Sequence, residues 1–160
     1  MIKSQQHCQF INLMLKDLQN EKKHMMFYLT ASATVTGLHR EEYRELFAKE
    51  AASEMQHVME FQDAVLGMGA NLVECTDLQT LPDFLVSYQA KELLNFALQM
   101  EEEVVANYAK RISEDVNMLD NPEKQWMEIF YEDQLAKSRK DVDNLKMILK
   151  GCNNSCHLHK

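Results

Sequence analysis

Glu54 and His57 form a Glu-x-x-His pair, and both residue types bind metal ions. In a helix, residues three positions apart lie on one face, about one turn from each other. A carboxylate and an imidazole placed in this way can bind one metal ion, while the second carboxylate oxygen bridges to another. Glu50 precedes the pair by one turn and is a further candidate ligand. Because Glu and His also fall three apart by chance on solvated helices, the pair needs support from other acids.

The composition predicts one all-helical domain that binds cations. A chain of 160 residues is long enough for one buried core, and only 4 Gly and 2 Pro favour long helices with few breaks. With 17 basic and 25 acidic residues, the net charge is −8. This charge disfavours nucleic acid and anionic membranes as partners. We expect no membrane association, because the sequence lacks both a long apolar run and the apolar segment of a signal peptide.

The cysteines predict a reducing compartment. Cys8, Cys75, Cys152 and Cys156 lack the spacing of a disulfide framework. We therefore expect a cytoplasmic protein with reduced thiols.

Apolar residues at helical spacing predict four helices, over residues 4–35, 41–68, 83–113 and 121–150. Asn121, Pro122 and Glu123 are typical of a helix start, as N-cap, first helical residue and acid of the first turn. Gly151 is expected to end the last helix. The predicted organisation is a four-helix bundle over residues 1–150, followed by a short C-terminal tail over 151–160.

The lengths of the linkers predict the topology of the bundle. Short linkers make helices one and two, and helices three and four, antiparallel hairpins. The middle linker has about 13 residues and can span about 43 Å. A helix of about 28 residues is about 42 Å long, so this linker can cross the whole bundle. Helices two and three would then be parallel, joined by the long crossover of ferritin-like folds.

Two further acids and one amide lie at matching heights in the predicted hairpins. Glu21 and Glu54 are nearly equidistant from the turn at Gly37, and Glu101 and Gln134 are nearly equidistant from the turn between helices three and four. A helical Glu is usually a solvated surface residue. Two matched pairs at mid-bundle instead indicate a carboxylate-rich interior, which would need cations to offset its charge.

The helices resemble those of bacterial-type, non-haem ferritins over residues 8–150. Asn20-Glu21 with Tyr28, then Glu54-Met55-Gln56-His57, is similar to ferritin helices one and two. Glu101 with Tyr108 resembles the third helix, and the Trp126 segment that ends in Gln134 resembles the fourth. Where bacterioferritins have a Glu-x-x-His on helix four, this chain has Gln134-Leu135-Ala136-Lys137, so the ferritin pattern fits better.

The resemblance implies a di-iron ferroxidase that contributes to iron storage. It implies one iron on Glu21, Glu54 and His57, and a second on the bridging Glu54 and Glu101, with Gln134 nearby. Tyr28 would be the phenol beside the site. The implied reaction oxidises Fe(II) with dioxygen or peroxide, and carboxylates with few imidazoles suit Fe(III). The implied assembly is a homo-oligomer, either a 24-subunit cage or a dimer.

Some positions depart from the ferritin pattern. Lys137 replaces an acid that helps to bind a third iron, so no third site is expected; it is otherwise a surface lysine or a partner of Glu102 or Glu103. Storage is weakened because cavity acids of animal ferritins correspond here to Ser53, Gln56 and Met59. Only ten residues follow helix four, too few for the fifth helix of a cage.

The remaining candidates are weaker. Met55 occupies the position of the bacterioferritin haem ligand, but bacterial ferritins without haem also have Met there, so haem is not expected. Trp126 is predicted to be a packing residue. The three histidines His7, His24 and His39 are interpreted as ordinary polar residues. The tail contains the soft-metal ligands Cys152, Cys156, His157 and His159, but their spacing matches no strong motif, so a flexible tail is expected.

Two other functions stay open at this point. One is a di-iron oxygenase or peroxidase on the same bundle, for which a second Glu-x-x-His would be typical. The other is a metal-free helical bundle that serves as a structural subunit, in line with Lys137 and the missing fifth helix. Bound iron would separate the metal-free bundle from both enzymes.

Overall fold

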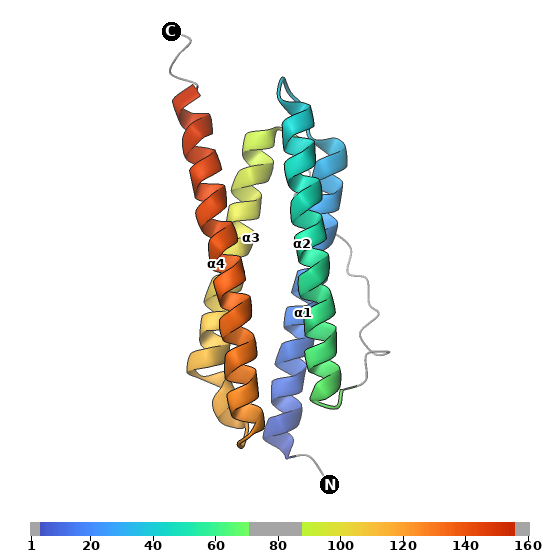
Figure 1. The fold of residues 1–160 in the computed structure, drawn as a ribbon, viewed down its shortest axis with the longest axis vertical. Helices are drawn as coiled ribbons and strands as arrows, with labels where there is room; N and C mark the ends of the chain where they lie inside the picture. Colours follow the sequence, from blue (N-terminus) through green and yellow to red (C-terminus); the bar gives the residue numbers. More distant parts are fainter. Residues whose placement is uncertain (1–3, 71–87, 156–160) are drawn as a thin grey trace.

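The computed structural model describes residues 4–70 and 88–155. Four long helices make up most of this part of the chain (Figure 1). They are α1 (Gln5–Thr34), α2 (Arg40–Gly67), α3 (Ala90–Ser113) and α4 (Glu123–Ser155), with a short 3-10 helix, η2 (Asp115–Met118), between the last two. The predicted all-α, ferritin-like four-helix bundle is confirmed.

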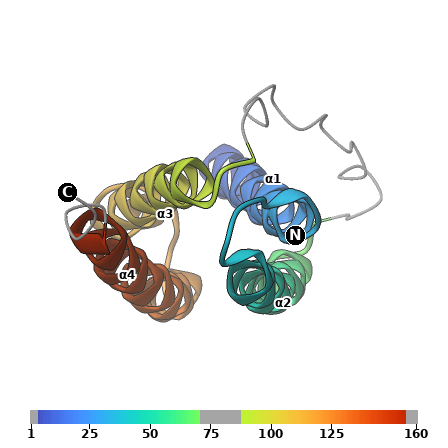
Figure 2. The ribbon, with the colours of Figure 1, turned by 90° about the horizontal axis from the view of Figure 1, so that it is seen from above.

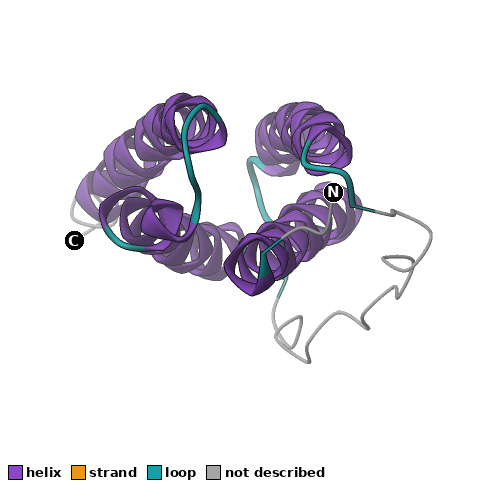
Figure 3. Cartoon of the chain, turned by 90° about the horizontal axis from the view of Figure 1, so that it is seen from below, coloured by secondary structure: helices purple, strands orange, loops and turns teal. Residues whose placement is uncertain are grey.

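The helices form two antiparallel hairpins, as the linkers predict. Figure 2 shows the α1–α2 and α3–α4 hairpins side by side, with α1 next to α3 and α2 facing α4 across the bundle. Viewed from the other end, the described chain consists of helices joined by short loops (Figure 3). Figure 1 shows that α2 and α3 run in the same direction, because α3 begins at the end of the bundle where α2 also begins.

A backbone contact fixes the start of α3 beside the first hairpin turn. The Thr36 N–H donates to the Tyr88 carbonyl at 2.9 Å, and Thr36 forms an isolated parallel bridge with Gln89. Gln89 is extended, so α3 begins at Ala90. The predicted start at Asp83 was therefore too early, since residues 88 and 89 are used for this contact instead of a helical turn. Residues 83–87 lie outside the described part of the chain.

The start and end of α4 also differ from the prediction. The helix begins at Glu123, one residue later than expected, after a cis Asn121–Pro122 bond. It continues through Gly151 to Ser155 instead of ending at Lys150. A glycine costs a helix about 1 kcal/mol relative to alanine but does not by itself stop it. The side chains of the predicted soft-metal tail lie outside the described residues.

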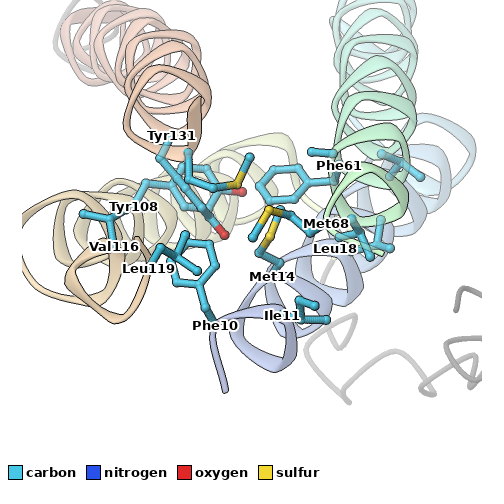
Figure 4. Close-up of a cluster of buried hydrophobic side chains, with 14 of the residues drawn as sticks. Phe10, Ile11, Met14, Leu18, Phe61, Met68, Tyr108, Val116, Leu119 and Tyr131 are labelled. Atoms are coloured by element: carbon cyan, nitrogen blue, oxygen red, sulfur yellow. The ribbon is translucent and has the colours of Figure 1, made fainter. Parts of the chain in front are cut away.

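Apolar side chains form two clusters, one toward each end of the bundle. Figure 4 shows the first, where Phe10 and Met14 of α1 pack with Phe61 of α2 and Tyr131 of α4. The second contains Phe27, Ala31, Phe47, Leu94 and Leu145. Burying such side chains stabilises the fold by about 1.5–3 kcal/mol each. In every long helix, buried polar residues lie between the stretches that feed the two clusters, so the bundle has a polar middle layer.

Trp126 is a packing residue, as predicted. Its ring covers Gly67 at the end of α2 so closely that an added Cβ would lie 2.5 Å from the ring carbon Cη2. The contact ties the start of α4 to the first hairpin. Among the described residues, no helix combines the length and the apolar character needed to cross a membrane.

Candidate metal centre

Five ionisable side chains from three helices meet in the polar middle layer. Glu21 and His24 come from α1, Glu54 and His57 from α2, and Glu101 from α3. Each is buried, with at most 8% of its surface exposed. Buried acids at this density are rare unless they are paired or bind a cation.

Glu21, Glu54 and His57 form the first group. The Nδ1 atom of His57 lies 3.4 Å from a Glu21 oxygen and 3.3 Å from Glu54 Oε2. One ligand atom from each residue lies within 4.8 Å of the others, which is close enough for a single metal ion to join them. The predicted facing of Glu21 and Glu54 across the first hairpin is therefore confirmed.

His24, Glu54 and Glu101 form a second group with the same spacing between ligand atoms. Glu54 belongs to both groups, as a bridging carboxylate would. Within the described parts of the chain, His24 Nδ1 and Glu54 Oε2 are buried and have no hydrogen-bond partner. The interpretation of His24 as an ordinary polar residue was wrong. Its signal was in the sequence, because Glu21-x-x-His24 repeats the spacing of Glu54-x-x-His57.

The acids of the centre share protons. Burial raises the pKa of Glu101 to about 8, and the charge of Asp141 adds to the rise. Burial also raises the pKa of Glu54 well above its ordinary value, together with the charges of Glu21 and Glu101. Burial acts to raise the pKa of Glu21 as well, but hydrogen bonds with His57 and Glu54 outweigh it and lower that pKa to about 2. A metal ion would displace the protons on Glu54 and Glu101.

Two buried tyrosines hold the outer carboxylates. Tyr28 donates its hydroxyl hydrogen to Glu101 Oε1 at 2.9 Å, and Tyr108 donates to Glu21. Burial raises the pKa of both phenols well above the ordinary value, so both remain neutral donors. Tyr28 lies beside the site as the sequence predicts. The contact of Tyr108 was not anticipated, although its place two turns after Glu101 could have indicated it.

On α4, Gln134 is buried near the centre. Its amide Nε2 donates to Glu60 at 2.6 Å, and its Oε1 has no hydrogen-bond partner among the described residues. Lys137 pairs with Glu60 at 2.8 Å and with Asp133 at 2.7 Å. The predicted pairing of Lys137 with Glu102 or Glu103 was wrong, since these acids lie on α3 and α4 turns Lys137 toward α2.

A cavity of about 440 Å³ lies between α2 and α4 and reaches His57. Glu50 lies half-buried in its wall, outside both ligand groups, opposite Asp141 of α4. Burial and the charge of Asp141 raise the pKa of Glu50. Asp141 was missed in the sequence, although it follows Gln134 by two helical turns. The side chain of Met55, the haem-ligand position, is 52% exposed.

The donors at the centre fit iron. Carboxylate oxygens are hard ligands, and imidazole nitrogens also bind iron. Soft metals prefer thiolates, and none of the five residues is a cysteine. The Nδ1 atom of His24 has no hydrogen-bond partner among the described residues, and it offers a nitrogen ligand to a bound cation. Glu54 Oε2, which lies 3.3 Å from His57 Nδ1, offers an oxygen ligand. The buried acids also require positive charge, which protons supply when no metal is bound. The residues present are therefore compatible with a di-iron centre.

Two solved structures share the fold. A ferritin-like, diiron-carboxylate protein from Bacillus anthracis str. Ames has a TM-score of 0.74 at 21% identity, and the match covers 92% of this chain and 99% of that one. A dodecameric thioferritin, the bacterioferritin-related protein from Bacteroides fragilis, has a TM-score of 0.77 at 16% identity, covering 96% and 91%. At these identities the likeness concerns the fold alone.

No curated protein sequence matches the chain. The family model of the ferritin-like domain matches residues 11–154, nearly the whole bundle and all five residues of the candidate centre. The chain therefore belongs to the family of ferritin-like domains.

Proposed function

We propose that this protein oxidises Fe(II) to Fe(III) at a di-iron centre in the middle of the bundle and contributes to iron storage. The observation that supports this most directly is the pair of ligand groups that share Glu54. Two adjacent metal positions joined by a carboxylate allow two electrons to pass to one oxidant. Membership of a family that includes di-iron oxidoreductases supports the same reaction.

The two ligand groups support roles for the individual residues. Glu21, Glu54 and His57 would bind the first iron, and Glu54 and Glu101 would bind the second. Gln134 of α4 is buried and donates to Glu60 of α2. Each Fe(II) held there would supply one electron to dioxygen or peroxide. Tyr28 fixes the orientation of Glu101 through its hydroxyl, and this phenol is available to donate an electron.

Proton release balances the charge when iron binds. Glu101 holds a proton at neutral pH because burial raises its pKa to about 8, and burial also raises the pKa of Glu54 well above its ordinary value. Bound iron would favour the ionised form of both carboxyl groups, so the buried centre would gain positive charge without leaving its carboxylates unpaired. Tyr28 and Tyr108 keep donating to the outer carboxylate oxygens throughout.

Storage requires an assembly of several chains around a cavity. We propose a homo-oligomer, either a cage or a smaller assembly, and a cytoplasmic location where reducing conditions supply Fe(II). The thioferritin with the same fold is named as a dodecamer. A particle of that size is therefore a further alternative to the 24-subunit cage and the dimer.

The test is the rate of Fe(II) oxidation in air, followed by the absorbance of Fe(III). We expect Glu54→Ala to lower the rate to that of buffer, because it removes the ligand common to both positions. Glu45→Ala is the matched control, since Glu45 is an exposed acid on the same helix. If the wild type oxidises iron no faster than buffer, the ferroxidase proposal fails and a metal-free structural bundle remains. The elution volume of the wild type separates cage from smaller assemblies.

A di-iron oxygenase or peroxidase on the same bundle is the second candidate. It is favoured by Glu21-x-x-His24, which is a second Glu-x-x-His pair. This pair lies on α1, whereas bacterioferritins have theirs on the fourth helix. Comparing the same iron-loaded protein with and without organic reductants separates the two functions. A ferroxidase accumulates Fe(III) over many turnovers, whereas an oxygenase or peroxidase keeps two irons and consumes its organic substrate.

A further inference from the structure

His24 is buried beside Glu54 and Glu101, yet the ligand set proposed above leaves it unused. Its side chain is 8% exposed, and its Nδ1 finds no hydrogen-bond partner in the described ranges. A ligand atom of His24 lies within 4.8 Å of ligand atoms of both carboxylates. A buried ring nitrogen without a partner costs free energy unless something else binds it.

Two other histidines in the described chain show ordinary behaviour. The Nε2 of His7 lies 3.2 Å from the Met68 carbonyl oxygen, and the Nδ1 of His39 lies 2.9 Å from a Glu42 oxygen at the exposed start of α2. Both contacts are hydrogen bonds of the kind that a polar surface residue makes. His24 differs from them because its nitrogen points into a group of carboxylates instead of meeting a backbone or surface partner.

The two Glu-x-x-His turns then give each metal an equivalent set of ligands. Glu21 and His57 meet at one position, and Glu101 and His24 at the other, with Glu54 common to both. Each metal would receive two carboxylates and one imidazole. Each metal position would therefore have at least one ligand from α1 and at least one from α2.

Gln134 is the competing ligand for the second position. Its amide nitrogen is already engaged by Glu60, and the same carboxylate binds the Lys137 ammonium. Its carbonyl oxygen has no hydrogen-bond partner in the described chain, so it could also approach a metal. A neutral amide oxygen is a weaker ligand than an imidazole nitrogen for Fe(II) or Co(II), which favours His24.

We infer that His24 is the nitrogen ligand of the second metal and that Gln134 is not needed for this metal to bind. The inference rests on the proposed di-iron centre and adds to it a ligand from α1. It also predicts that both metals carry an imidazole, which gives the two positions similar affinities.

Co(II) binding tests this inference without using activity. Equilibrium dialysis of the full-length protein against Co(II) gives the number of ions per chain, and proton NMR of the Co(II) protein shows each coordinated imidazole through its hyperfine-shifted signals. We expect two ions and signals from two histidines in the wild type. His24→Ala should bind one ion and retain only the His57 signals. Gln134→Ala, which removes the competing ligand, should keep two ions and both sets of signals. His39→Ala is the matched control and should behave like the wild type.

His24→Leu, which keeps the volume of the ring more closely, covers the case in which His24→Ala does not fold. Two ions and two imidazole signals in either folded His24 variant would overturn the inference while leaving the di-iron proposal intact. Loss of one ion in Gln134→Ala but not in the His24 variants would assign the ligand to Gln134 instead. A wild type that binds no Co(II) would overturn the inference and the proposed centre together.

Discussion

Two buried clusters of charged residues lie one helical turn apart on α1, and they are neutralised in different ways. Asp17 receives both Nε and Nη2 of Arg111 at 2.9 and 3.0 Å, and the hydroxyl of Tyr131 at 2.8 Å. Arg111 also binds Asp115 at 2.7 Å through its remaining nitrogen. One turn later, Glu21 meets the acids, imidazoles and phenols of the metal centre.

The difference between these clusters separates a structural network from the candidate functional centre. In the Asp17–Arg111 cluster the protein supplies its own cation, with every nitrogen of the guanidinium in a hydrogen bond. Such a network orients α1, α3 and α4 and neutralises the buried carboxylates without a bound ion. In the candidate metal centre, protons take the place of a cation, and within the described ranges His24 Nδ1 has no hydrogen-bond partner. Buried acids therefore indicate function only when the fold provides no internal cation for them.

Removing the internal cation should have the largest effect on stability. Arg111→Met would leave Asp17 buried and unpaired, and we expect the free energy of unfolding to fall by about 3–5 kcal/mol. Urea denaturation measures the change. The double variant Asp17→Asn with Arg111→Met should recover part of the loss, because it removes the unpaired charge. Equal stability of the single variant and the wild type would contradict the assigned role of Arg111.

Binding of a divalent cation at the candidate centre should stabilise the folded protein by a similar amount. At about 1,000 times the dissociation constant, Zn(II) should raise the free energy of unfolding by about 4 kcal/mol, because it binds the folded state. Differential scanning calorimetry with and without Zn(II) measures this. The gain should be lost in Glu54→Ala and retained in Glu45→Ala. A gain that persisted in Glu54→Ala would mean that Zn(II) binds elsewhere.

The protonated acids should make the metal-free protein sensitive to pH. Glu101 has a pKa raised to about 8 by burial, so between pH 6.5 and 8 the folded chain holds a proton that the unfolded chain has lost. Stability is therefore greatest at the lower pH and falls as pH rises through 8, by about 1.4 kcal/mol per pH unit for one proton. Burial acts to lower the pKa of His57, but the hydrogen bond with Glu21 outweighs it and raises this pKa. His57 therefore contributes to the same loss of stability as pH rises.

Urea midpoints at several pH values measure this slope. Glu101→Gln keeps the shape of the side chain but cannot titrate, so its slope should be smaller than that of the wild type. Saturating Zn(II) should also reduce the slope, because the metal displaces the proton. A wild-type stability that rises over the same interval would contradict the raised pKa of Glu101.

Exposed ion pairs should have the smallest effect. Lys146 and Glu102 lie 3.0 Å apart, and each side chain is about half exposed. Water and salt screen such pairs, so Lys146→Ala should cost at most about 1 kcal/mol. The comparison with Arg111→Met under the same urea conditions isolates the effect of burial. A cost that equals that of Arg111→Met would remove the distinction between the buried network and the surface.

Much of the fold was predictable because it depends on local patterns. Helical spacing of apolar residues gave the four helices, and linker lengths gave the two hairpins and the parallel α2 and α3. The errors lay at the ends of helices. The start of α3 depends on Tyr88 and Thr36, which are far apart in the sequence, and no local pattern reports their contact.

The candidate centre was predictable only in part. Glu54 and His57 are neighbours within one helix, and symmetry about the turn placed Glu21 opposite them. For Lys137 the sequence left a surface position or a pair with Glu102 or Glu103 open, and the structure pairs it with Glu60 and Asp133. Which face of α4 meets α2 depends on the rotation of each helix about its axis, and packing of whole side chains decides that rotation.

The sequence by itself determined four amphipathic helices, their order and the Glu-x-x-His turns, because these depend on residues within a few positions of each other. Only the tertiary structure decided which acids meet a cation. It joined Asp17 to Arg111, 94 residues away, and left His24 Nδ1 without a hydrogen-bond partner in the described chain. The physical reason is that charge neutralisation in a buried layer depends on distances between helices, which packing alone sets.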